Sequence, residues 1–287
     1  MKISAIRKKY HERLCDQIIR TNTLNSITYP NFSDSSSRAS VNIGMSLLAI
    51  LNKPIMTGHQ KEQTIGKSFE EATKDFLEES FSLLSHIRPG YWLYTTRNTE
   101  ISNYEQYEHL ARLGSKIKGD KDLSSVLGQD YIVKPDIIIA RHPLSDDEIN
   151  LNQEILIDGE EVCTHTPLRS INFENPGMWI LHASISCKWS IRSDRSQNTR
   201  TEALNLIRNR KGKLPHICAV TAEPLPTRIA TLALGTGDLD CVYHFALSEL
   251  HQAVKNANNE DQLEMLEIMI NGKRLRDISD LPLDLAI

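Results

Sequence analysis

The chain has 287 residues, of which 40% are hydrophobic and 24% charged, and its formal net charge is −4. This composition indicates an ordinary globular protein, and the five cysteines, without a CxxC pair, argue for reduced thiols in the cytoplasm and against a structural zinc site. The longest apolar run near the charged N-terminus, Leu47–Leu51, is far too short for a secretion signal or a membrane span, so we expect no export and no membrane role.

Helical periodicity dominates the first third of the chain. In residues 1–24 apolar side chains recur every four positions, which predicts one helical face. The serine-rich stretch 31–40 is typical of an exposed linker, and a helix is expected over 42–51. A longer amphipathic helix is expected over 65–87, with Glu70 beside its apolar stripe, where a carboxylate ordinarily faces solvent.

The middle of the chain begins with a predicted strand over 91–95 and a predicted helix over 104–116, neither of which carries recognisable chemistry. Asp136 directly follows a proline, which restricts the residue before it to extended geometry. It heads the β-branched run 137–140, which predicts a buried strand. Asp136 is therefore expected at the start of a strand in the core.

A second strand is expected over 180–188, whose side chains alternate between a polar and an apolar face. Ser186 and Lys188 share the polar face. A lysine at the end of a strand that begins in an apolar run is costly to desolvate without an anionic partner. Asp136 and Glu202 are the partners that the sequence offers.

A helix is expected after this strand. Thr199 and Glu202 have capping-box spacing, which predicts that Glu202 lies in the first turn. The segment from Lys188 to Lys213 carries eight basic and two acidic residues, so it is locally +6 while the rest of the chain is about −10. Such a segment would draw a polyanion to one face, as in a nucleic-acid site. A solvated basic helix face is the alternative.

The C-terminal part is predicted to supply further core elements. A strand is expected over 217–221, and helices are expected over 245–257 and 261–270. Arg228 lies in a proline-rich stretch that is typical of a loop, where a single arginine ordinarily has no special function. The apolar residues of 281–285 are expected to dock on this subunit or on another.

An aspartate on one strand, a lysine on the next and a second carboxylate nearby form the arrangement of a metal-dependent phosphodiesterase. Asp136, Lys188 and Glu202 fit this description. Paired carboxylates hold hard divalent cations, which neutralise charge on the phosphate and lower the pKa of bound water, while the lysine stabilises developing negative charge. Taken singly, the three residues could instead cap a turn, form an ordinary ion pair and complete a capping box.

Four motifs then make the chain recognisable. They are Lys134-Pro135-Asp136, Ser186-Cys187-Lys188-Trp189, Arg192-Ser193-Asp194-Arg195 and Glu202. Together they resemble the NgoMIV family of type II restriction endonucleases, from the group that cuts sites with a CCGG core. The resemblance covers nearly the full length. It implies an α/β fold with a central mixed β-sheet flanked by helices, as a single domain over 1–287 with its catalytic core at about 65–230.

For catalysis, the resemblance implies Mg²⁺, two ions per active site, held by Asp136 and Glu202 with Glu70 as a possible helper. Lys188, with Ser186 beside it, would activate the nucleophile or stabilise charge. The wider nuclease pattern, PD…(D/E)xK, has an acidic residue two positions before the lysine, where this chain has Ser186. Because a serine cannot supply that negative charge, Glu202 must reach the site from the helix.

For DNA recognition, the resemblance assigns the inner bases to Arg192, Asp194 and Arg195. Arginine forks donate two hydrogen bonds to guanine, and an aspartate accepts one from cytosine N4, so Arg-x-Asp-Arg can read two adjacent G·C pairs in the major groove. A non-specific phosphate binder would avoid a carboxylate at the position of Asp194. The outer base pair is assigned to Ser36, Gln63 and Arg228.

The expected function is cleavage of both strands of a palindromic DNA duplex at G^CCGGC, leaving 5′-phosphates and 5′ overhangs. Two-fold related subunits would read one site, and dimers would pair back to back as tetramers. Two alternatives remain at this point. One is an endonuclease of the same fold with a different CCGG-containing or structure-specific target, and the other is a non-catalytic DNA-binding protein.

Overall fold

The computed structural model describes residues 2–97, 99–118, 133–157, 162–170, 177–235 and 237–287, without the side chains of residues 118 and 193–195. Within these residues no helix is both long and apolar enough to cross a membrane.

The central feature is a mixed sheet in the order β4-β5-β6-β7-β8-β9. Its strands are β4 (Trp92–Thr95), β5 (Ile137–Arg141), β6 (Ile180–Lys188), β7 (His216–Thr221), β8 (Cys241–His244) and β9 (Leu275–Asp277). The first three pair antiparallel, and β6 to β9 pair parallel. The expected α/β class with a central mixed sheet is thus confirmed.

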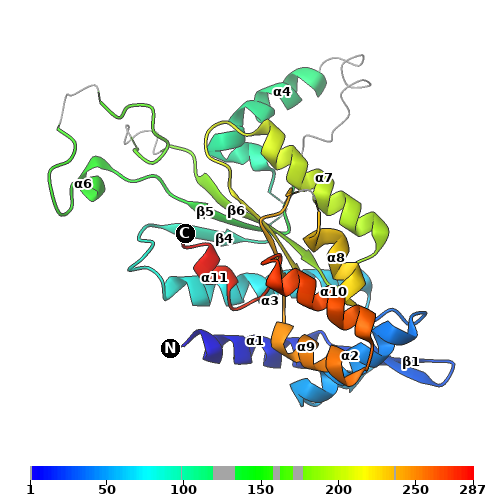
Figure 1. Ribbon diagram of the computed structural model, residues 1–287. Helices are drawn as coiled ribbons and strands as arrows, with labels where there is room; N and C mark the ends of the chain where they lie inside the picture. Colours follow the sequence, from blue (N-terminus) through cyan, green and yellow to red (C-terminus); the bar gives the residue numbers. More distant parts are fainter. Residues whose placement is uncertain (1, 98, 119–132, 158–161, 171–176, 236) are drawn as a thin grey trace.

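Helices cover both sides of this sheet (Figure 1), with α3 and α1 on one side and α7 and α4 on the other. The longer ones are α1 (Ile3–Gln17), α2 (Arg38–Leu51), α3 (Glu62–Ser82), α4 (Glu108–Lys118), α7 (Ser193–Asn209), α8 (Pro226–Ala233), α9 (Leu247–Asn256) and α10 (Glu260–Asn271). Short turns of helix are η1 (Ile101–Asn103), η2 (Glu105–Tyr107), α6 (Asp146–Ile149) and α11 (Leu281–Asp284). A small sheet has the order β2-β1-β3, from β1 (Arg20–Leu24), β2 (Ile27–Pro30) and β3 (Met56–Thr57).

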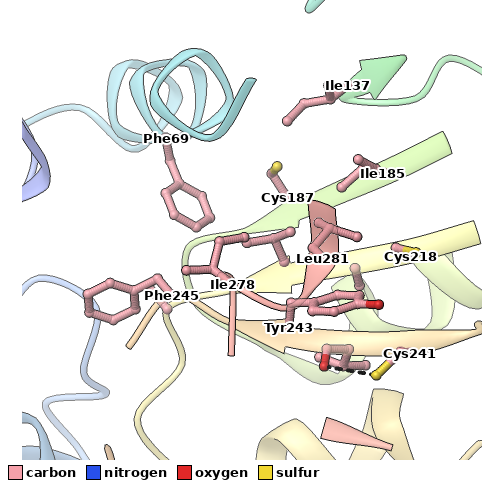
Figure 2. Close-up of a cluster of buried hydrophobic side chains, with 14 of the residues drawn as sticks. Phe69, Ile137, Ile185, Cys187, Cys218, Cys241, Tyr243, Phe245, Ile278 and Leu281 are labelled. Atoms are coloured by element: carbon pink, nitrogen blue, oxygen red, sulfur yellow. Dashed lines mark hydrogen bonds between the residues drawn. The ribbon is translucent and has the colours of Figure 1, made fainter. Parts of the chain in front are cut away.

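The core lies between the sheet and its helices. Ile137 to Ala140 are fully buried, as the β-branched run predicted, because β5 has a neighbour on each side and helices over its faces. In β6 the alternation also holds, since Leu181, Ala183 and Ile185 are buried. Figure 2 shows Phe69 of α3 pointing toward this apolar side.

The expected docking of the chain end is confirmed on this subunit. Leu281 and Leu285 of the α11 region are buried, and His182 of β6 contacts the Leu285 carbonyl through Nε2 at 2.8 Å. Figure 2 places Leu281 beside the core strands. The last residues therefore stay close to the sheet that carries the site.

Several elements differ from the sequence prediction. The helix α1 ends at Gln17, and the chain then enters β1. The helix α2 begins at Arg38 rather than 42, because the side chain of Ser37 accepts the N–H of Ser40 and caps it there. Short strands β8 and β9 were not predicted, because four and three residues are too few to show a period.

Two further differences affect proposed site residues. The helix α7 begins at Ser193, so Glu202 lies in its middle and the capping-box prediction at Thr199 is wrong. Thr199 is buried, with its hydroxyl 3.5 Å from that of Ser186, and so it faces the sheet instead of capping a helix. Arg228 lies in the first turn of α8 rather than in a loop, because Pro226 occupies a position that suits a helix start.

Candidate active site

The site begins where β5 starts and β6 ends. These strands are antiparallel with Ile137 opposite Ile185, so Asp136 lies beside the last residues of β6. Its Oδ2 atom accepts hydrogen bonds from Lys188 Nζ at 3.0 Å, from the Cys187 backbone N–H at 2.7 Å and from Ser186 Oγ at 3.4 Å. The anionic partner expected for Lys188 is therefore Asp136, and Ser186 and Lys188 do share one face.

Two more carboxylates approach this pair from opposite helices. Glu70 comes from α3 and Glu202 from α7. Burial and the negative charge of Asp136 raise the pKa of Glu70 to about 7, although Lys188 opposes the shift. Burial, opposed by Lys188 and reinforced by Asp136, raises the pKa of Glu202. The three acids and the lysine therefore share one electrostatic field.

The lysine in this field stays charged. Burial by itself lowers the pKa of Lys188, but the adjacent Asp136 and the charge of Glu202 outweigh it, so the pKa is raised above its usual value. A permanently protonated lysine can donate hydrogen bonds and stabilise negative charge, but it is a poor general base. Its chemistry at this site is therefore electrostatic.

The residue types fit a hard divalent cation. Carboxylate oxygens are the protein ligands that Mg²⁺ prefers, and burial together with the negative charge of Asp136 raises the pKa of both glutamates, a cost that a bound cation would offset. In the described part of the chain, no three carboxylate, imidazole or thiol side chains form a ready-made ligand set.

The acids and the lysine face a cleft of about 1190 Å³. Its walls also carry residues that the sequence assigned to DNA recognition. Of the proposed site residues, those lining the cleft are Gln63, Glu70, Asp136, Lys188, Arg192, Glu202 and Arg228. Residues far apart in the chain thus meet in one cavity.

The proposed reader of the inner bases lies at the start of α7. Arg192 is the N-cap residue, its side chain is 64% exposed, and its guanidinium is 3.8 Å from Glu62 Oε1. Asp194 and Arg195 lie in the first helical turn, but their side chains lie outside the described part of the structure. The backbone therefore places all three residues at the helix end that adjoins the cleft.

Sequence reasoning missed Asp34, another residue of the cleft wall. Asp34 lines the cleft, forms an ion pair with Arg228, and accepts hydrogen bonds from the backbone N–H and the hydroxyl of Ser36 at 2.9 and 2.7 Å. These Ser36 bonds, with Arg228, lower the pKa of Asp34 to about 2. Asp34 therefore joins two of the proposed outer-base readers. An aspartate two residues before a serine is the pattern of a local side-chain turn, which could have flagged it.

The basic segment divides in two. Lys188 and Arg192 line the cleft, whereas Arg200 pairs with the buried Asp238, and Arg210 donates to a carbonyl of its own helix. Part of the local +6 charge thus serves the fold, a use that neither the nucleic-acid site nor the solvated helix face considered for this segment had included.

The mixed sheet and its helices define the chain as an α/β protein with a carboxylate–lysine cleft at the strand ends. Residues 10–287 match the family described as NgoMIV restriction enzyme. The type II restriction enzyme NgoMIV of Neisseria gonorrhoeae is 47% identical over 286 residues, covering 98% of this chain and 97% of that protein. The chain belongs to this family and is a type II restriction endonuclease.

Solved structures with weaker likeness belong to other restriction endonucleases. Bse634I with cognate DNA has 13% identity and a TM-score of 0.36, and covers 87% of this chain and 99% of its own. A PspGI–substrate DNA complex has 16% identity and a TM-score of 0.25, over 99% of this chain and 92% of its own.

Proposed function

We propose that this enzyme cleaves both strands of DNA at the palindrome GCCGGC in a Mg²⁺-dependent reaction, cutting after the first G and leaving 5′-phosphates and 5′ overhangs. The observation that carries the proposal is the meeting of Asp136, Lys188 and Glu202 with Arg192 and Arg228 in one cleft. The 47% identity to NgoMIV over almost the whole chain supports the same target group.

In this proposal Asp136 and Glu202 hold the metal, two ions per site, and Glu70 assists. Bound Mg²⁺ would supply charge neutralisation at the scissile phosphate and a more acidic water. Lys188 orients or stabilises the negatively charged oxygen, because its raised pKa keeps it protonated. Ser186, 3.4 Å from Asp136, helps to fix the orientation of that carboxylate.

Recognition falls to two groups of residues. Arg192, Asp194 and Arg195 read the CCGG core through the major groove. Gln63, Ser36 and Arg228 read the outer pair, and the last two are joined through Asp34.

A palindromic target implies two-fold related copies, one on each half-site. We propose dimers that read one site and pair back to back as tetramers. Double-stranded DNA is the partner, and the cytoplasm is the compartment that suits five free cysteines.

The test is digestion of a plasmid with two GCCGGC sites, with and without Mg²⁺, followed by sequencing of the ends. Discrete Mg²⁺-dependent fragments ending at those sites are expected. Cutting at other CCGG-containing sites would retain the active site and the core reader but reject the outer-base assignment. Absence of cutting under every condition would favour the binding-protein alternative.

A further inference from the structure

A buried carboxylate outside the cleft lining holds two loops in place. Glu223 follows β7 and is fully buried. Its Oε2 atom accepts the backbone N–H of Ile191 at 2.8 Å, and its Oε1 atom accepts that of Leu225 at 3.2 Å. Each oxygen thus takes one main-chain donor, from segments separated by 34 positions in the chain.

Both donors immediately precede proposed base-reading elements. Ile191 precedes Arg192, the N-cap of α7. Leu225 is the N-cap of α8, whose first turn contains Arg228. One side chain therefore fixes where both helices begin, and with them the starting points of two arginines on the cleft walls.

The same segment is bonded to the strand that carries the lysine. The Lys188 carbonyl accepts the Thr221 hydroxyl at 2.8 Å and the Ala222 N–H at 3.2 Å. The Glu223 N–H donates in turn to the Thr221 hydroxyl at 3.1 Å. Residues 221–223 thus hold both ends of the short connection from Lys188 to Arg192.

We propose that Glu223 is a positioning residue that sets Arg192 and Arg228 at a fixed distance from Lys188, so that cleavage depends on reading the correct bases. This inference rests on the proposed function. Burying a carboxylate is costly without compensation, and main-chain N–H groups supply that compensation here. A hydrophobic residue of similar size would pack in this place but would hold neither loop.

Burial and hydrogen bonding act in opposite directions on the pKa of Glu223. Burial raises its pKa to about 7, opposed by the Ile191 and Leu225 hydrogen bonds and by Arg228, and reinforced by Asp34. The carboxylate therefore stays in place through its two hydrogen bonds rather than through a full ion pair. Losing either bond should release one loop.

The variant Glu223→Gln isolates this role, because glutamine keeps the shape but has one acceptor oxygen and turns an amide N–H₂ toward one of the two donors. We would measure kcat/KM on a GCCGGC duplex and on duplexes changed at one inner or one outer base pair. The kcat/KM on the GCCGGC duplex, divided by that on a changed duplex, is expected to fall about tenfold, which is the effect of weakening one bidentate contact.

Asp240→Asn is the matched control. Its carboxylate accepts the Ile217 N–H at 2.8 Å at the other end of β7, and its ratio should equal that of the wild type.

The outcomes separate the two proposals. If Glu223→Gln keeps the wild-type ratio, whether its rates are unchanged or fall equally on all duplexes, Glu223 contributes only to stability and the inference is overturned. If that variant does not fold, Glu223→Asp keeps the charge with a shorter reach, and an unchanged ratio in it would overturn the inference in the same way. Wild-type enzyme that cuts GCCGGC no faster than the changed duplexes would reject the proposed function and, with it, this inference.

Discussion

Lys188 Nζ lies 3.0 Å from Oδ2 of Asp136, and the same oxygen receives the N–H of Cys187 at 2.7 Å. This one carboxylate oxygen therefore pairs with the lysine and is held in orientation by a backbone N–H from the lysine's own strand. This arrangement compensates both charges before any substrate arrives.

Removing this carboxylate should separate binding from cleavage. Asp136→Ala is expected to abolish cleavage while leaving DNA binding intact or tighter, because one negative charge near the phosphate disappears. Gel-shift titration with a GCCGGC duplex, beside a cleavage assay of the same protein, measures both. Cleavage at the native rate by Asp136→Ala would show that the catalytic assignment is wrong.

The glutamate on α7 should control metal affinity. Glu202→Gln keeps the size of the side chain but removes its charge, so the Mg²⁺ concentration that gives half-maximal cleavage should rise about tenfold or more. Glu264→Gln, an exposed acid on α10, is the control and should leave the Mg²⁺ dependence unchanged. An unchanged Mg²⁺ requirement in Glu202→Gln would show that Glu202 is not the second metal ligand, and Glu70 would then be the next residue to substitute.

The two arginines on the cleft walls should affect different base pairs. Arg192→Ala should weaken binding to every CCGG duplex by about 1–3 kcal/mol, because it loses a bidentate contact to the core. Arg228→Ala should instead erase the preference for the outer G·C pair and leave the preference for the core. Competition binding with duplexes changed at one pair distinguishes them. Equal losses on all duplexes from both variants would indicate phosphate contacts only.

Acid should destabilise the fold through a buried histidine. Burial lowers the pKa of His244 to about 4, and its Nδ1 accepts the Ala246 N–H at 3.1 Å, which only the neutral ring can do. The His244 imidazole is protonated near pH 6.5 in the unfolded chain and near pH 4 in the folded chain. The free energy of unfolding therefore falls as the pH drops through this window, by about 3 kcal/mol in total.

Denaturant titrations between pH 7 and pH 4 would measure this effect. His244→Gln should show a shallower dependence of the unfolding free energy on pH, whatever its stability at pH 7. His182, whose pKa is also about 4, contributes in the same sense, and Glu223 in the opposite sense. His182 and Glu223 both remain in the His244→Gln variant, so the difference in pH dependence between variant and wild type measures the contribution of His244. Parallel curves would show that His244 does not carry the expected slope.

Local patterns in the sequence predicted the core of the site well. The alternation in β6 placed Ser186 and Lys188 on one face, and the cost of burying a lysine predicted its acidic partner. Both predictions depend on neighbours in a strand or on the free energy of a single charge. Neither pattern identifies which distant segment supplies the partner, which is Asp136, 52 positions before the lysine.

Features set by tertiary contacts were not predictable in this way. The capping-box pattern at Thr199 is present in the sequence, but that residue packs against the sheet from inside a helix that begins at Ser193. Asp34 and Glu223 act across 194 and 32 positions of the chain, on Arg228 and Ile191. No periodic pattern reports such long-range pairs.

The short connection between Lys188 and Arg192 also constrains how such an enzyme can change over time. Lys188, proposed to support bond breaking, and Arg192, proposed to read the bases, share one five-residue stretch that residues 221–223 hold at both ends. A substitution within the stretch itself would therefore alter cutting and reading together, so a new target could not be acquired there without a change in the rate of cleavage.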